Sequence, residues 1–365
     1  MRKPADTNPS GVIGRTDHAG LALLLAFGIT ANLLEMALPR IPVFPWIRLG
    51  LAQIFTLAVI ILYSPMEGIR FSVLRTLVAG FLSGMPLTSF LFSGLAGIVA
   101  AAAMGCLWWS FGRRGVLGVV GISVVGAVCH NLIQIAIAYG MFVKSAAFLW
   151  QIPWALLFSL ASGCVVGFLA VPVILAFSRL GPVDIAAQGR IPVEPSNRRK
   201  ALFAALLASF VAVFFVDHWS GFAVLFSLLV PLLVTLHVVR KDWQTAVFRF
   251  WGLFFWIAAT QLFFTPGRYL IPPVTYEGLN QAILLSLRLL FCVLVSLALQ
   301  KSGGMDWALS ALCRRTGNNA FEIVTGALGA LPVLAATAKR LRWRTITCFD
   351  QALAECVAEL SAKGK

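Results

Sequence analysis

Long apolar runs follow one another along most of this chain and constrain its fold more than any other feature. A helix needs about 20 apolar residues to cross the roughly 30 Å hydrocarbon layer of a bilayer. Hydrophobic residues make up 59% of the 365 residues and charged residues only 12%, whereas a soluble domain carries about 25% charged residues. The pattern predicts an all-α, polytopic membrane protein with about ten spans. The runs lie near 19–38, 49–64, 71–86, 88–111, 116–142, 146–178, 201–217, 220–238, 246–264 and 278–299.

The spacing of these runs divides the chain into segments. A polar tail, 1–17, precedes a six-helix module, 18–180, whose second and third runs are short enough to indicate tilt or burial among neighbours. The stretch 181–200 (GPVDIAAQGRIPVEPSNRRK) is polar, contains proline and glycine, and is predicted to be a linker. A roughly four-helix module, 201–300, follows. The basic segment 301–365 has shorter apolar stretches, which favours amphipathic helices on the cytoplasmic surface.

Lysine and arginine between the runs predict the orientation, since cytoplasmic loops of membrane proteins carry an excess of both. With the N-terminus inside, the outer loops of the first module contain only Arg40, Arg48 and Lys144. Its inner segments contain Arg2, Lys3, Arg15, Arg70, Arg113, Arg114, Arg179, Arg190, Arg198, Arg199 and Lys200. We therefore expect a multi-pass protein of the inner (cytoplasmic) membrane with a cytoplasmic N-terminus.

Several function classes are disfavoured by the same sequence. The net charge of +15 lies in clusters between apolar runs, without the basic-aromatic motifs of nucleic-acid binding. The seven cysteines show no Cys-x-x-Cys or Cys/His spacing, so no metal or other cofactor is predicted. The aspartates are scattered and lack the paired motif that holds Mg²⁺-diphosphate. We expect no catalytic residues and no nucleic-acid partner, and a chain that is not an enzyme.

Polar residues of separate predicted helices fall on the outer half of the first module. A polar side chain in lipid needs a partner or a cavity, so their convergence predicts a substrate-binding pocket under the proline-rich loop 39–50. The alternative is that these groups only cross-link helices. Arg75 lies one turn into the third run from the inner face, where snorkelling to the inner surface explains it as well as a role in a pocket does. Gly80 and Gly84 are interpreted as sites of close helix packing. The predicted pocket residues are Glu35, Trp46, Arg48, Ser89, Ser93, His130, Asn131 and Gln134.

Four stretches of the first module carry a family resemblance: LPRIPVFPWIRLGLAQIFTL (38–57), LRTLVAGFLSG (74–84), SFLFSGLAGIVAAAAMG (89–105) and GISVVGAVCHNLIQIAIAY (121–139). Together they resemble the heptaprenyl diphosphate synthase component I family, also called the Gx transporter family, over about 18–180. That family often has asparagine where this chain has Gln53. The module also resembles the S component of energy-coupling factor (ECF) vitamin transporters, which implies a ligand in the outer half and a bacterial inner membrane.

The second module is similar to the CbiQ-like T component of the same transporters. The similar stretches are NRRKALFAALLASF (197–210), YEGLNQAILLSLRLLFCVLVSLAL (276–299) and GALGALPVLAATAKRL (326–341). AKRLRWRT (338–345) stands where that family has its first ATPase-coupling motif, which implies coupling residues Lys339, Arg340, Arg342 and Arg344. No Gly-x-x-x-x-Gly-Lys-[Ser/Thr] loop is present, so ATP-binding subunits would act in trans.

Three functions follow as hypotheses. The first is a transport protein that carries a small or amphipathic ligand, for which the resemblance implies an isoprenoid, quinone-type, flavin or vitamin-like molecule. The second is a non-catalytic accessory subunit of a polyprenyl diphosphate synthase. The third is an assembly partner in a membrane redox complex. The expected partners are the lipid bilayer together with ATP-binding, synthase or redox subunits.

Overall fold

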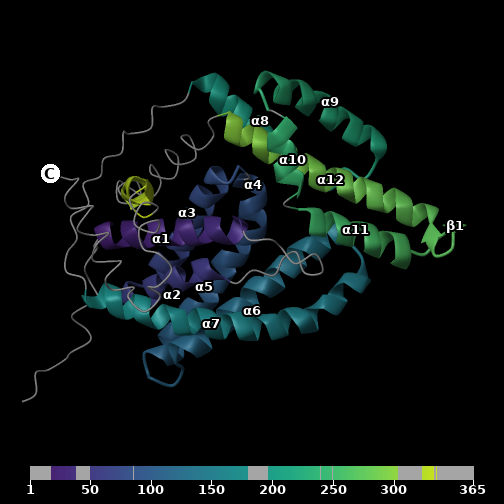
Figure 1. Cartoon of the computed structure of the whole chain (residues 1–365). Coiled ribbons are helices and arrows are strands. Elements are labelled where there is room, and N and C mark those ends of the chain that lie inside the picture. Colours follow the sequence, from purple (N-terminus) through teal and green to yellow (C-terminus); the bar gives the residue numbers. More distant parts are fainter. Residues whose placement is uncertain are drawn as a thin grey trace, which may run out of the picture.

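The computed structural model describes residues 18–37, 50–84, 86–179, 196–238, 240–248, 250–302, 323–332 and 334, and these are helical almost throughout (Figure 1). Each of the ten predicted apolar runs coincides with helix over most of its length, which confirms the all-α membrane class. Five helical segments are long and apolar enough to cross a bilayer, or six if a bent pair counts as one span. They are His18–Met36, Pro86–Gly112, Val119–Val143, Ala146–Arg179 and Tyr276–Lys301.

The first module is a bundle around a short central helix. Helix α2 contacts α1, α3, α5 and α7 and is buried over most of its length, as the short second run predicted. The α-helices of this module are α1 (His18–Ala37), α2 (Leu51–Leu62), α3 (Pro65–Leu82), α4 (Pro86–Ser89), α5 (Leu95–Leu107), α6 (Val119–Ala138) and α7 (Ile152–Arg179). Short π-helical segments η2 (Phe90–Gly94), η3 (Trp108–Gly112) and η4 (Tyr139–Val143) and the 3₁₀ segment η5 (Ala146–Gln151) connect or extend them.

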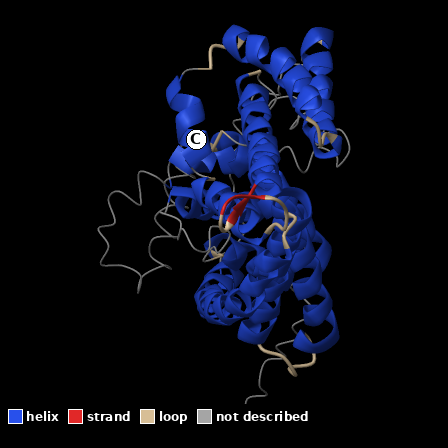
Figure 2. Cartoon of the chain, turned by 90° about the vertical axis from the view of Figure 1, so that its right-hand side faces the viewer, coloured by secondary structure: helices blue, strands red, loops and turns tan. Residues whose placement is uncertain are grey.

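The second module packs around α12 (Tyr276–Lys301), which contacts α8, α9, α10 and α11. A two-stranded antiparallel hairpin joins α11 to α12 and faces the viewer in Figure 2. The remaining elements are α8 (Asn197–Ala212), η6 (Val213–Phe215), α9 (Trp219–Thr235), α10 (Arg240–Phe248), α11 (Trp251–Phe264), β1 (Tyr269–Ile271) and β2 (Val274–Thr275). Helices α10 and α11 meet at 55°, so the predicted run 246–264 is not one straight helix.

Two boundaries differ from the sequence prediction, and local capping explains one of them. Helix α3 begins at Pro65 instead of residue 71, since the Ser64 Oγ accepts a hydrogen bond from the backbone N–H of Glu67 at 3.2 Å. A serine cap followed by proline at the first helical position is a strong start signal. Helix α8 begins at Asn197, so the last four residues of the predicted linker are helical.

The hydrophobic cores do not coincide with the two modules. One core consists of first-module residues together with the segment 323–334, whose Ala327 and Ala330 are fully buried. The other joins α8–α12 to the first module, for example through Phe142 of η4, whose ring meets the ring of Phe214 in η6 edge-on at 5.7 Å. The modules therefore share their apolar interior. Within the predicted surface segment 301–365, the described helical residues 323–332 are correspondingly packed into the core of the first module.

Helix α12 contacts the ends of first-module helices that the sequence assigns to the outer side. The Gln300 Nε2 donates to the Phe81 carbonyl at 3.1 Å, and the Ser296 Oγ accepts from the Thr88 backbone N–H at 3.1 Å. Gln300 lies at the end of α12 predicted to be cytoplasmic. This end of α12 therefore lies beside a first-module turn predicted to be outer, and α12 extends well past α1 in Figure 1.

Close approach of neighbouring segments occurs at several glycines, including the two named from the sequence. A Cβ added to Gly163 or Gly167 of α7 would lie 2.6 Å from the Cα of Val124 or Val120 in α6. Gly80 is also close to a neighbouring backbone, since its Cβ would lie 3.2 Å from the Pro86 Cα. Gly84 has a second reason to be glycine: it has φ +87° in the turn after α3, a conformation that favours glycine, and an added Cβ would lie 2.9 Å from the Gln300 Oε1 of α12.

Candidate functional site

Polar side chains of α6 lie on the buried side of the helix, as the spacing of His130 and Gln134 predicted. His130 is 7% exposed, Asn131 3% and Gln134 2%. The Gln134 Nε2 lies 3.0 Å from the His130 Nε2, so the two side chains form one pair along the helix. Residues four apart on a helix are neighbours on its surface.

Asn131 is directed to a different partner. Its Nδ2 donates to the Ser159 Oγ of α7 at 2.8 Å, and that hydroxyl donates in turn to the Ala155 carbonyl. This side chain therefore links α6 to α7, the role that the alternative interpretation assigned to such residues.

Ser89 and Ser93 are both 4% exposed, at the end of α4 and within η2. Segment η2 packs against α6, so Ser93 lies in a segment beside α6, and Ser89 immediately precedes that segment. The Ser89 Oγ and the Gln134 Oε1 have no hydrogen-bond partner among the described residues. Since burying a polar atom without a partner costs free energy, both atoms are available to a bound molecule.

Glu35 lies at the end of α1 and caps α2. Its Oε1 accepts a hydrogen bond from the Leu51 backbone N–H, where a carboxylate also interacts favourably with the helix dipole. The two remaining predicted pocket residues, Trp46 and Arg48, lie outside the described residues, as do the coupling residues Lys339, Arg340, Arg342 and Arg344.

The snorkelling interpretation of Arg75 is wrong. Because α3 begins at Pro65, Arg75 lies roughly 15 Å along it, too far to reach the inner surface, and it is 2% exposed. Its Nη1 donates to the Thr56 Oγ1 of α2 at 3.2 Å. Its Nη2 lies 3.7 Å from the position that a Cβ on Gly97 would occupy. In the sequence, a single arginine within an apolar run is the feature that could have predicted a buried polar position here.

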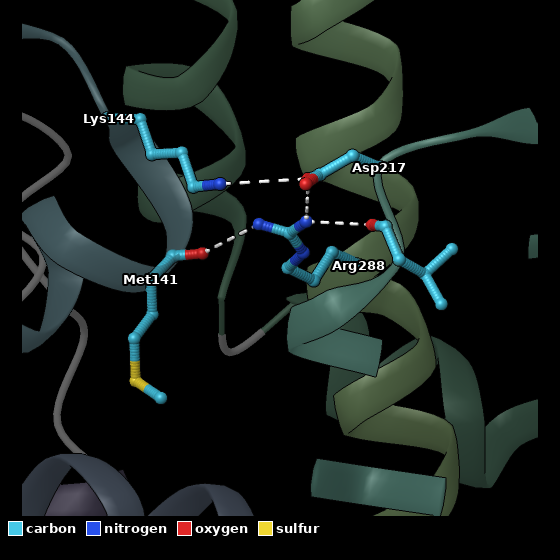
Figure 3. A network of polar contacts seen from close by, with 5 residues as sticks. Met141, Lys144, Asp217 and Arg288 are labelled. Carbon is cyan, nitrogen blue, oxygen red and sulfur yellow. Dashed lines mark hydrogen bonds and ion pairs between the residues drawn. The ribbon is translucent and has the colours of Figure 1, made fainter. Parts of the chain in front are cut away.

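A second polar cluster joins the two modules and was not predicted (Figure 3). Arg288, in the middle of α12, is 2% exposed. Its Nη1 donates to the Met141 carbonyl of η4 at 3.3 Å, and its Nη2 donates to the Val216 carbonyl at 2.8 Å. The same Nη2 donates to the Asp217 carboxylate at 2.7 Å, and the Lys144 Nζ lies 3.7 Å from that carboxylate. We call these five residues the junction cluster.

The junction cluster changes the acidity of its carboxyl group. Asp217 lies in the turn before α9, and its pKa is lowered from 3.8. The hydrogen bond from Arg288 is the main cause, and burial acts in the opposite direction. Lys144 lowers the pKa further by a smaller effect. A carboxyl whose pKa is lower in the folded protein stabilises the fold above its unfolded-state pKa. That stabilisation is lost as the pH falls through the lowered folded-state value.

We therefore expect Asp217→Asn to reduce stability at pH 7 and the difference from wild type to shrink as the pH falls below about 4. The measurement is the thermal unfolding of both proteins in detergent between pH 7 and pH 3. A difference that stays constant over this range would contradict the assignment.

Among the described residues no group of three or more His, Cys, Asp or Glu side chains is placed to hold a metal ion. The junction cluster and the polar side chains of α6 are two of the groups of buried polar residues in the described part of the chain, and we base the functional proposals on these two.

Comparison with known proteins finds a similarity within the first module. Residues 24–173 match the family model described as heptaprenyl diphosphate synthase component I. Searches of curated proteins and of solved structures found no match. The matched range contains α2 to α6 and most of α1 and α7, including His130, Asn131 and Gln134. Over residues 24–173 this multi-pass membrane chain is therefore similar to the heptaprenyl diphosphate synthase component I family, the family that its sequence resembles.

Proposed function

We propose that this protein is a membrane transport protein whose first module binds a small or amphipathic ligand beside α6, while the second module acts as its scaffold. The observation that carries the proposal is the buried His130–Gln134 pair in the middle of a membrane-spanning helix. Polar groups inside a membrane are costly and usually mark a functional site. The unpartnered Gln134 Oε1 and Ser89 Oγ supply hydrogen-bonding groups for a ligand.

The ligand class follows from chemistry and from the family description. The α6 face combines a few polar atoms with an apolar surround that includes Leu91 and Ile135. Such a surface suits a molecule with a polar ring or head and an apolar body. An isoprenoid or quinone-type molecule fits that description and agrees with a family named after a prenyl diphosphate synthase; a flavin or vitamin-like molecule is the other candidate of this class.

Native mass spectrometry of the detergent-extracted protein tests the proposal. We expect a defined small molecule to remain bound to wild type and to be lost from His130→Ala or Gln134→Ala. Val125→Ala is the matched control, because Val125 is an exposed residue of the same helix. If the His130→Ala and Gln134→Ala variants fold as wild type does and retain the same molecule, the α6 face does not bind it.

A second candidate is a non-catalytic accessory subunit of a polyprenyl diphosphate synthase or of a membrane redox complex. It is favoured by the family description, which names a component of a synthase. Purification from native membranes in mild detergent distinguishes the candidates: a co-purifying synthase or redox subunit, with no small molecule, supports the accessory role. Co-purifying ATP-binding subunits that are lost on deletion of 338–365 would instead support coupled transport.

A further inference from the structure

The junction cluster borders a cavity of about 650 Å³ between the modules. The turn after η4, the turn before α9, and helices α11 and α12 all contribute to its wall. None of the predicted pocket residues that the structure describes lines it. The cavity is therefore separate from the α6 face, although the two lie in the same protein.

The ionic groups on the cavity wall carry a net positive charge. Lys144 and Arg288 are cationic, and Asp217 is the one carboxylate among the lining residues. The Arg288 side chain is only 3% exposed, and its Nε has no hydrogen-bond partner among the described residues. Its two Nη atoms are held by the Met141 and Val216 carbonyls and by Asp217 (Figure 3). The Arg288 side chain is thus fixed in place. Its Nε–H remains a free donor within the described residues, and its positive charge is only partly neutralised, because Asp217 also pairs with Lys144.

Lys144 supplies the accessible positive charge. Its side chain is 43% exposed and its Nζ is 3.7 Å from Asp217, too long for a strong hydrogen bond. Its backbone has φ +51°, a conformation that non-glycine residues adopt at a cost and that recurs at functional sites. The Lys144 ammonium group therefore lies at the cavity wall, and its ion pair with Asp217 leaves it able to contact an anion.

The rest of the wall is partly apolar and partly amide. Leu284 and Leu285 are buried lining residues, Phe264 is 65% exposed at the edge, and the exposed Gln281 adds an amide. A cation pair beside apolar side chains suits an anionic group attached to an apolar body, because each part meets a matching surface.

Exposed aromatic residues place this cavity near a membrane–water interface. Trp219, Tyr269 and Tyr276 are all about half exposed or more, and they lie at the start of α9, in β1 and at the start of α12. The Trp219 Nε1 donates to the Asn280 Oδ1 at 2.8 Å. Tryptophan and tyrosine concentrate at the level of lipid headgroups. An anionic group in the cavity would lie at that level.

We propose that the junction cavity binds a phosphate-type anionic group, carried by a membrane amphiphile whose headgroup enters between the two modules. The phosphate contacts Lys144 and the Arg288 guanidinium, and the apolar part of the molecule follows Phe264 and Leu284 towards the lipid. Asp217 holds Arg288 in position through the hydrogen bond of 2.7 Å. This proposal does not depend on the ligand proposed for the α6 face.

The test measures lipid binding to the full-length protein in neutral detergent by native mass spectrometry. Phosphatidylglycerol and phosphatidylcholine are titrated separately, with inorganic phosphate as a competitor. We expect wild type to bind phosphatidylglycerol in preference to phosphatidylcholine. In Lys144→Gln the affinity for phosphatidylglycerol should fall roughly fivefold to tenfold, because one charged contact is lost. Gln281→Glu, which adds a negative charge at the exposed edge, should weaken binding in the same direction.

The matched control is Arg179→Gln, which removes one exposed positive charge at the end of α7 and should leave the affinity unchanged. The occupant is a free anion if inorganic phosphate displaces phosphatidylglycerol and, at the same concentrations, protects wild type but not Lys144→Gln against thermal unfolding. Equal binding of phosphatidylcholine and phosphatidylglycerol would overturn the proposal, and so would wild-type affinity in both Lys144→Gln and Gln281→Glu. Loss of a ligand in the α6 variants alone leaves this site unaffected, so the two tests fail independently.

Discussion

Replacing Arg288 with methionine is expected to lower the free energy of unfolding by about 2–4 kcal/mol, since it removes a buried cation that holds three acceptors. The Met141 and Val216 carbonyls, which accept its hydrogen bonds at 3.3 and 2.8 Å, would lose this donor at the boundary between the modules. Methionine keeps most of the apolar stem, so the loss reports the polar contacts. Reversible unfolding in mixed micelles measures the effect.

The control for this experiment is Arg268→Met, because Arg268 is exposed in the loop before β1. Exposed substitutions away from specific contacts usually change stability by no more than about 0.5 kcal/mol. Asp217→Asn should cost less than Arg288→Met, since the Asp217 side chain is 65% exposed. An Arg288→Met variant as stable as Arg268→Met would show that the junction cluster does not hold the modules together.

The contact between α6 and α7 gives the second large effect. Gly163→Ala and Gly167→Ala each place a methyl group 2.6 Å from a Cα atom of α6, closer than non-bonded atoms tolerate, and the obstacle is backbone that cannot rotate away. The helices must separate, which also stretches the Asn131–Ser159 hydrogen bond of 2.8 Å. Forcing extra atoms into a packed interface costs about 1–3 kcal/mol per site. Thermal unfolding in detergent measures the loss for each variant and for the pair.

Gly140→Ala is the matched control for these variants. Gly140 lies in η4, and a Cβ there would have no atom within 4 Å. Alanine at such a position is expected to leave stability unchanged or to raise it slightly, since it restricts the unfolded chain. If Gly163→Ala and Gly167→Ala behaved like Gly140→Ala, the close approach of α6 and α7 would be incorrect.

The helices of this protein could be predicted because lipid imposes a simple rule on sequence. An apolar run must be helical in a membrane, where every backbone polar group needs an internal partner. The start of α3 was also readable, since Ser64, Pro65 and Glu67 form a capping sequence, but the apolar run alone placed it six residues late. That error moved Arg75 from the membrane interior to the surface. The burial of His130, Asn131 and Gln134 followed correctly from their place in an apolar run.

The junction cluster could not be predicted from local pattern. Arg288 and Met141 are 147 residues apart, and the acceptor is a backbone carbonyl, which carries no side-chain signal. In the sequence, Asp217 is one of several scattered aspartates, and nothing in the residues next to it indicates an ion pair with α12. The hydrogen bond between Gln300 and Phe81 likewise depends on how the two bundles pack together and not on either bundle alone. The sequence therefore predicts the individual helices and the burial of the polar residues of α6, whereas the packing of one module against the other can be seen only in the structure.

A ligand beside the α6 polar face is the central claim, and cryo-electron microscopy of the wild-type protein in lipid nanodiscs tests it most directly. We predict non-protein density between α6 and the α4–η2 segment, within hydrogen-bonding distance of Gln134 and Ser89, and its disappearance in Gln134→Ala. A map in which protein side chains alone fill that space, with Gln134 and Ser89 hydrogen-bonded to other residues of the chain, would contradict the claim.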